Sequence, residues 1–171
     1  MKKSTSIYVL LIVSVLIGAS HFSLKPLDNG SILVLDGIEI DLFGIAKNQW
    51  TRHTRNCADI SLSKSDDEKY QLAKKLISEY SPPHSQSIQI ASALTSGDWM
   101  LVEAEFTNLL PAVVTIKLEN NQPAIVPNAI WSGQTHPWKA APHIRDYIAR
   151  QSPDVPMALI NCFDPQSRSF K

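Results

Sequence analysis

The pattern of hydrophobic and polar residues predicts two helices separated by a series of strands. Residues 66–80 place apolar side chains at helical spacing, with charged and polar side chains opposite them. Ser65 and Glu68 have the spacing of a capping box, which would begin this helix. A second, shorter helix is expected to begin near Pro142, a good first-turn residue, and to end before Pro153.

Between and beside these helices, alternating apolar and polar residues indicate strands. Residues 31–43 are rich in branched apolar side chains around Asp36-Gly37, a dipeptide that favours a hairpin turn. Residues 47–64 are expected to be irregular. Residues 157–163 fit a strand or a helix, and we favour a strand. The middle of the chain is expected to form an antiparallel meander of four strands, at residues 87–94, 99–107, 111–118 and 124–131.

This order of elements predicts an α+β fold. We expect a curved antiparallel sheet of four to six strands, with one long and one short helix packed on one face. The length suits a single hydrophobic core, so residues 21–171 are expected to form one domain.

The first twenty residues have the order of a secretory signal peptide. Two lysines follow Met1, residues 7–19 contain one polar side chain, and small residues lead to a cleavage position expected after Ser20. The apolar run is shorter than the roughly 20 residues of a membrane-spanning helix, so we favour cleavage over an uncleaved anchor. We therefore expect a periplasmic or secreted protein. The alternative is an inner-membrane anchor that holds the domain on the periplasmic side.

The cysteines indicate the type of compartment, and the charges limit the classes of partner. Cys57 and Cys162 are far apart in the sequence, and in an oxidising compartment we expect them to form a disulfide. Sixteen basic residues balance sixteen acidic ones, and the basic residues do not cluster. We therefore expect no nucleic-acid partner, and a membrane partner only if the leader is uncleaved.

Part of the predicted sheet resembles a group of small secreted domains. A strand begins at Trp99, the strand at residues 111–118 ends in an asparagine-rich turn, and a Trp-Ser-Gly turn at Trp131 precedes the helix that ends before Cys162. This arrangement, over residues 87–163, is similar to cystatin-like or NTF2-like domains. The resemblance implies that the two strands pair, and it does not fix a function.

The segment most suited to binding is residues 131–138. Exposed tryptophans carry more binding energy than other side chains, against glycan rings or a protein, so an exposed loop here would bind a partner. For the indoles themselves we favour the other interpretation, that both fold back to cap the sheet. The candidate binding residues are Trp131, Ser132, Thr135, His136 and Trp138.

Candidates for catalysis are few. Glu103 and Glu105 share one face of a predicted strand about 7 Å apart, within the range that glycosidases use, and His136 is a third candidate. The alternative is a solvated sheet face. No histidine or cysteine spacing matches a zinc site, and the sequence has no glycine-rich phosphate loop. We expect no metal and no cofactor.

These patterns favour binding over catalysis. We expect an exported, non-enzymatic protein of the cell envelope that binds an envelope protein or glycan, as an inhibitor, immunity or accessory protein. One alternative is an envelope hydrolase that cleaves cell-wall glycan or peptide with the sheet-face carboxylates. A second alternative is a membrane-anchored structural subunit of an envelope complex.

Overall fold

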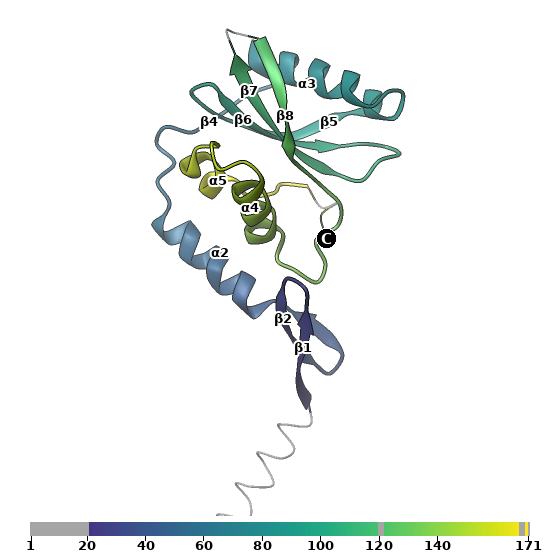
Figure 1. Cartoon of the computed structure of the whole chain (residues 1–171), viewed down its shortest axis with the longest axis vertical. Coiled ribbons are helices and arrows are strands. Elements are labelled where there is room, and N and C mark those ends of the chain that lie inside the picture. Colours follow the sequence, from purple (N-terminus) through teal and green to yellow (C-terminus); the bar gives the residue numbers. More distant parts are fainter. Residues whose placement is uncertain (1–20, 120–121, 168–169, 171) are drawn as a thin grey trace, which may run out of the picture.

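The computed structural model describes residues 21–119, 122–167 and 170. The expected signal peptide, residues 1–20, lies outside the described residues. The fold is α+β, as predicted, and contains a small and a large antiparallel sheet (Figure 1). Residues 22–54, the N-terminal unit, lie beside a body that is built on the large sheet.

The N-terminal unit begins with three antiparallel strands in the order β1-β2-β3, which we call the small sheet. The turn between the second and third strands has positive φ at Asp36 and Gly37, 48° and 84°, as a tight hairpin turn requires. The predicted hairpin is therefore confirmed, and a further strand precedes it. The three strands are β1 (Phe22–Leu27), β2 (Gly30–Leu35) and β3 (Ile38–Ile40).

Helix α2 (Leu42–Thr54) follows, so the expectation of irregular structure over residues 47–64 is wrong in its first part. Asp41 begins the helix, because its carboxylate accepts a hydrogen bond from the backbone N–H of Gly44 at 2.7 Å. The helix has no apolar face directed at the body. Its buried residue is Asn48, and a helix without a buried apolar stripe has no hydrophobic periodicity by which the sequence could predict it.

The large sheet has the order β4-β5-β6-β7-β8, with every neighbouring pair antiparallel. The predicted meander is confirmed, and Gly97, with φ of 56°, makes the first turn. The sheet's strands are β4 (Ser61–Leu62), β5 (Gln89–Ser96), β6 (Trp99–Glu105), β7 (Ala112–Glu119) and β8 (Gln122–Ser132).

Helices cover both faces of the large sheet, so their expected placement on a single face is wrong (Figure 1). The long helix α3 (Glu68–Tyr80) packs Ala73 and Ile77 against one face, and the short helix η1 (His84–Ser87) follows it. Helices α4 (Ala140–Gln151) and α5 (Met157–Cys162) cover the other face.

The apolar residues of the central strand β6 explain this second layer. Met100 and Val102 point to the α3 side, whereas Leu101 packs with residues of α4 and α5. A sheet with apolar side chains on both faces must be covered on both. The segment at residues 157–163, which we expected to be a strand, supplies part of this cover as helix α5.

The expected capping box is also wrong. The residue that precedes α3 is Asp67, and no side chain caps the helix. The Asp67 carboxylate instead accepts a hydrogen bond from the backbone N–H of Lys64 at 2.7 Å, which stabilises the turn before the helix.

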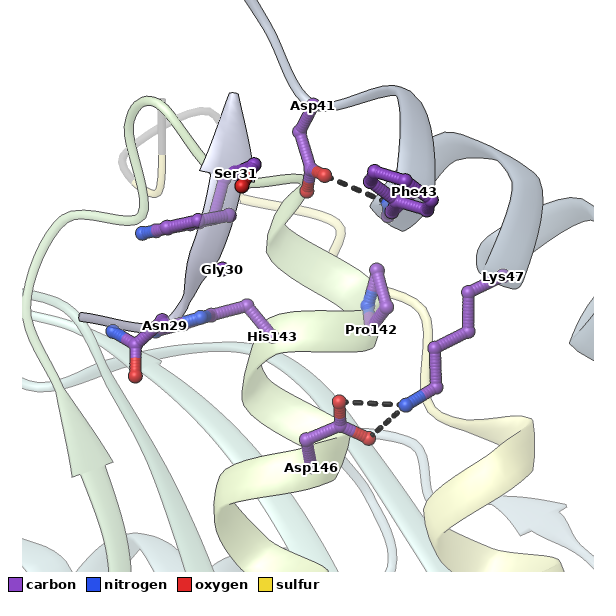
Figure 2. Close-up of a pocket in the computed structure, with 11 residues that line it drawn as sticks. Asn29, Gly30, Ser31, Asp41, Phe43, Lys47, Pro142, His143 and Asp146 are labelled. Atoms are coloured by element: carbon purple, nitrogen blue, oxygen red, sulfur yellow. Dashed lines mark hydrogen bonds and ion pairs between the residues drawn. The ribbon is translucent and has the colours of Figure 1, made fainter. Parts of the chain in front are cut away.

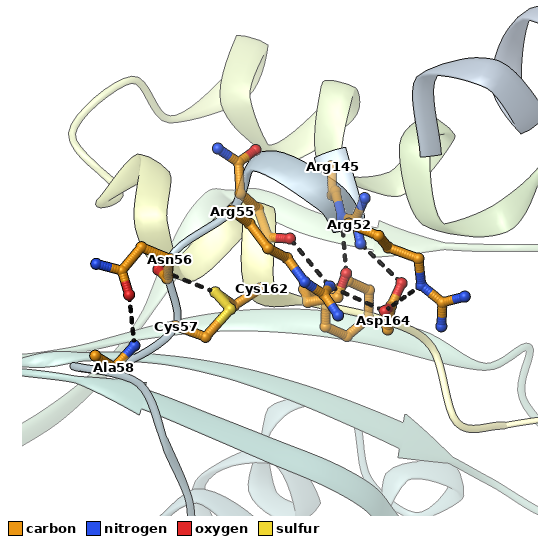
Figure 3. Close-up of a disulfide and its surroundings, with 10 residues drawn as sticks. Arg52, Arg55, Asn56, Cys57, Ala58, Arg145, Cys162 and Asp164 are labelled. Atoms are coloured by element: carbon orange, nitrogen blue, oxygen red, sulfur yellow. Dashed lines mark hydrogen bonds and ion pairs between the residues drawn. A yellow bond between two sulfur atoms is a disulfide. The ribbon is translucent and has the colours of Figure 1, made fainter. Parts of the chain in front are cut away.

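The disulfide between Cys57 and Cys162 is confirmed, with a Cα–Cα distance of 5.8 Å (Figure 3). It joins the segment that follows α2 to the end of α5, over a sequence separation of 105 residues. Closing such a long loop restricts the unfolded chain, and the chain-entropy model assigns about 4 to 5 kcal/mol to this effect.

Beside the disulfide, Arg145 of α4 is buried, and each of its three guanidinium nitrogens donates a hydrogen bond (Figure 3). Its guanidinium donates to the Phe163 carbonyl at 2.7 Å, to the Asn48 side chain at 3.1 Å and to the Asp164 carboxylate at 2.8 Å. Asp164 also pairs with Arg52 at 3.1 Å and Arg55 at 2.9 Å. This cluster, which we call the Arg145–Asp164 cluster, links α2, α4 and the segment after α5.

The first prediction concerns Asp164. Asp164→Asn should lower the free energy of unfolding by about 3 kcal/mol, because it leaves the buried Arg145 charge without its carboxylate. Asp146→Asn is the control, since Asp146 makes an ion pair with Lys47 in which both side chains are exposed, and pairs of this kind contribute less than about 1 kcal/mol. Equal losses for the two variants in denaturant melts would contradict the assigned role of the cluster.

Candidate functional site

The structure separates the two tryptophans of the predicted binding loop. Trp131 is on β8 and only 6% exposed, so it is not an exposed binding residue. Its ring makes edge-to-face contacts with Phe170, at 5.2 Å between ring centroids, and with His143 at 6.3 Å. Trp131 therefore belongs to the core between the large sheet and α4, which confirms the favoured interpretation for this residue.

The rest of the segment is divided between structural and surface positions. Thr135 is buried, and its hydroxyl donates to the Phe170 carbonyl, so it holds the end of the chain in place. Ser132 and His136 are exposed. Ser132 lines an apolar groove of about 460 Å³, which also includes Ile77 of α3 and Phe106.

Trp138 is half-buried and forms a wall of two neighbouring clefts. The first, of about 320 Å³, lies where the small sheet and α2 meet α4 (Figure 2). The second, of about 470 Å³, includes Thr135 and His136 together with Arg52. The sequence therefore identified residues of a cleft, but not its other walls, which come from α2 and the segment after α5.

The polar groups of the first cleft already bind one another (Figure 2). Asp41 accepts from the backbone N–H groups of both Gly44 and Lys139, which ties the start of α2 to the start of α4. Lys47 contacts both carboxylate oxygens of Asp146 at 2.6 Å. These interactions position the N-terminal unit against the body.

His143 completes the wall of the first cleft. Its ring is stacked on Trp138, with ring planes 5° apart and centroids 6.3 Å apart. Burial lowers the pKa of His143 from its ordinary value, and the nearby Arg150 lowers it further. At neutral pH the imidazole is therefore an uncharged stacking partner for Trp138.

The two candidate catalytic glutamates differ in environment. Glu103 is fully buried, and its carboxylate accepts from the Ser92 hydroxyl at 3.0 Å and from the backbone N–H groups of Gln166 at 2.9 Å and Ser167 at 2.7 Å. Glu105 is half-buried and accepts from the Ser167 hydroxyl. Neither lines the two clefts beside Trp138.

Glu103 therefore anchors the C-terminal segment to the sheet. A general acid or base must reach the substrate, and Glu103 is covered by the segment that it binds. The alternative of a solvated sheet face is wrong for Glu103 as well. The sequence signal that would have indicated this role is a carboxylate surrounded by apolar residues on a central strand.

The surface of the N-terminal unit is unusually apolar. Among the described residues, twelve large apolar side chains are exposed, and seven of them lie between residues 22 and 50. Exposed apolar residues that gather in one region mark interaction sites. The seven are Phe22, Leu24, Ile38, Leu42, Phe43, Ile45 and Trp50.

Helix α2 contributes to this surface because its amphipathicity is reversed. Gly44, Asn48 and Thr51 follow the i, i+4, i+7 spacing of one helix face, and all three are buried or half-buried. Phe43 and Trp50, which are at positions i and i+7 and so lie on the same side of the helix, are 73% and 71% exposed. The helix thus directs its polar side to the body and its aromatic side to the solvent.

The described residues contain no group of three or more histidine, cysteine, aspartate or glutamate side chains that could hold a metal ion. None of the helices in the described part of the chain is long and apolar enough to cross a membrane. No family model, curated protein or solved structure matches the chain. The resemblance to cystatin-like or NTF2-like domains stays a prediction.

A second prediction distinguishes the two tryptophans. Trp131→Ala should lower the free energy of unfolding by about 3 to 5 kcal/mol, because it empties a core position. Trp138→Ala should cost clearly less, since that indole is partly exposed at the wall of the clefts. Denaturant melts of both variants provide the comparison. A loss below about 1 kcal/mol for Trp131→Ala would be incompatible with its place in the core.

Proposed function

We propose that the protein is exported to the cell envelope and acts there by binding another envelope component, not by catalysis. The N-terminal unit provides the binding surface. The observation that carries this proposal is the reversed amphipathicity of α2, which leaves Phe43 and Trp50 exposed on one side of the helix.

Two features support export. The Cys57–Cys162 disulfide is typical of proteins in an oxidising compartment. Residues 1–20 have the basic, apolar and small-residue order of a secretory leader. A bacterial periplasm fits both, with the cell exterior as the second location.

The exposed side of α2 supports binding to a protein. Helices that dock into a groove present large apolar side chains at i, i+3, i+4 and i+7 positions. Phe43 and Trp50 take the i and i+7 positions of such a series, with the exposed Ala46 at i+3. Tryptophan is the side chain most enriched among residues that dominate binding energy. An envelope protein with an apolar groove therefore suits this helix better than a glycan does.

The burial of Glu103 weighs against the envelope hydrolase. Its carboxylate is occupied by three donors and has no access to solvent. Activity would require the C-terminal segment to leave the sheet, which breaks the hydrogen bonds from the backbone N–H groups of Gln166 and Ser167 to the carboxylate.

The third prediction tests the α2 surface. Chemical cross-linking of the full chain in the envelope of the cells that make it should capture a partner protein. Phe43→Ser with Trp50→Ser should reduce capture by at least about thirtyfold, because hot-spot residues contribute about 2 kcal/mol or more. Folding should be preserved, since both side chains are exposed in the native state.

The matched control is Leu62→Ser with Met157→Ser, which removes two apolar side chains that are also exposed but lie in the body, on β4 and α5. This control should capture the partner as the unaltered chain does. Equal capture by the α2 variant would contradict the proposal. Loss of activity on cell-wall fragments in a folded Glu103→Gln variant would favour the hydrolase instead.

A further inference from the structure

One face of the small sheet carries six large apolar side chains, with Pro26 and Ser31 at its other end. In the strand register, Phe22 lies opposite Leu35 and Leu24 lies opposite Leu33. Leu33 and Leu35 in turn lie opposite Ile40 and Ile38. Residues at alternate positions of a strand share a face, so these six residues form one surface, which we call the outer face.

The body contacts the opposite face of the small sheet. Ile32, which alternates with the outer-face residues of β2, is fully buried. Gly30 lies beside the Trp138 ring, where a Cβ atom would be in van der Waals contact at 3.6 Å. Lys25 and Glu39 are paired at 2.7 Å on this inner side. The outer face is thus turned away from the protein, with Leu24 69% and Ile38 65% exposed.

An exposed apolar sheet face is unusual, because three-stranded sheets gain their stability by covering such a face. Within the described residues, no helix packs on it, and α2 leaves the small sheet to contact α4 and α5 (Figure 1). The outer face therefore requires an occupant from outside the described part of the chain.

We propose that the outer face docks on the lipid surface of the membrane across which the chain is exported. The proposal rests on export, as in the proposed function, but concerns a different surface from the side of α2 that would bind a protein. It means that the small sheet lies flat at the bilayer interface, with its six apolar side chains among the lipid headgroups and upper acyl chains.

The position of the leader in the sequence supports this occupant. Residues 7–19 are almost wholly apolar, and no aspartate, glutamate, lysine or arginine lies between Lys3 and Lys25. Phe22, the first residue of β1, is two positions after the expected cleavage position, a span of at most about 7 Å. A leader retained as an anchor would therefore hold the small sheet at the bilayer surface, whereas after cleavage the outer face alone would hold it there.

The composition of the outer face also suits lipid. It contains no charged residue and carries Phe22 at the strand end nearest the leader, and aromatic side chains are common at membrane interfaces. The charged side chains of the small sheet, Lys25 and Glu39, are on the inner side, where they would stay hydrated.

The test uses the chain as cells process it, with its N-terminus read by intact mass. Co-sedimentation with vesicles of phosphatidylethanolamine and phosphatidylglycerol measures lipid binding. Leu24→Ser with Ile38→Ser should lower the partition coefficient by at least about tenfold, because two apolar side chains no longer enter the lipid. Leu62→Ser with Met157→Ser should leave the coefficient unchanged, since these residues are exposed elsewhere on the surface.

A second measurement applies even if the leader is retained and binds lipid by itself. A polarity-sensitive dye on Leu24→Cys should shift its emission to the blue when vesicles are added, whereas the same dye on Leu62→Cys should not. Two results would overturn the proposal. One is that the unaltered chain, with its leader cleaved, does not co-sediment with vesicles, and the other is that vesicles shift the emission of the two dye positions equally.

One further outcome would identify a different occupant. A concentration-dependent dimer that Leu24→Ser with Ile38→Ser abolishes, without lipid binding, would assign the outer face to a second copy of the chain and overturn the lipid proposal. If the chain fails to bind vesicles but still captures a partner protein through α2, this proposal is wrong and the proposed function stands. The failure of the one is therefore distinguishable from the failure of the other.

Discussion

The buried guanidinium of Arg145 is the interaction on which the arrangement of the chain depends. It is 4% exposed, and it binds α2 through Asn48 and the segment after α5 through Phe163 and Asp164. A charge buried in this way is tolerated only when its donors find acceptors. The hydrogen bonds of Arg145 therefore hold α2, α4 and the segment after α5 in fixed positions relative to one another.

The same requirement explains the apolar surface of the N-terminal unit. Asn48 must point inward to reach Arg145, and Arg52 and Arg55 must reach Asp164, so the polar side of α2 is committed to the body. The aromatic side of the helix is then necessarily exposed. The nearby disulfide fixes the end of the segment that follows α2, so the helix cannot turn its apolar side inward without breaking the cluster.

The sequence predicted those parts of the fold in which burial follows a regular pattern. The strands of the meander alternate with period two, helix α3 follows period 3.6, and the hairpin has the Asp36-Gly37 turn. The disulfide was predicted from the oxidising compartment that the leader indicates. Helix α2 was missed because it buries Asn48 rather than apolar residues. Glu103 was expected on a solvated or catalytic face and is buried instead, because it binds the backbone of Gln166, which is remote in the sequence.

We propose that the N-terminal unit is the surface that the protein presents to the envelope. Hydrogen–deuterium exchange of the folded protein, with and without its native envelope fraction, tests this claim most directly. We expect slower exchange in β1 to β3 and in α2, and no change in the loop at residues 133–139. Protection confined to that loop, with unchanged exchange in β1 to β3 and α2, would contradict this role of the N-terminal unit.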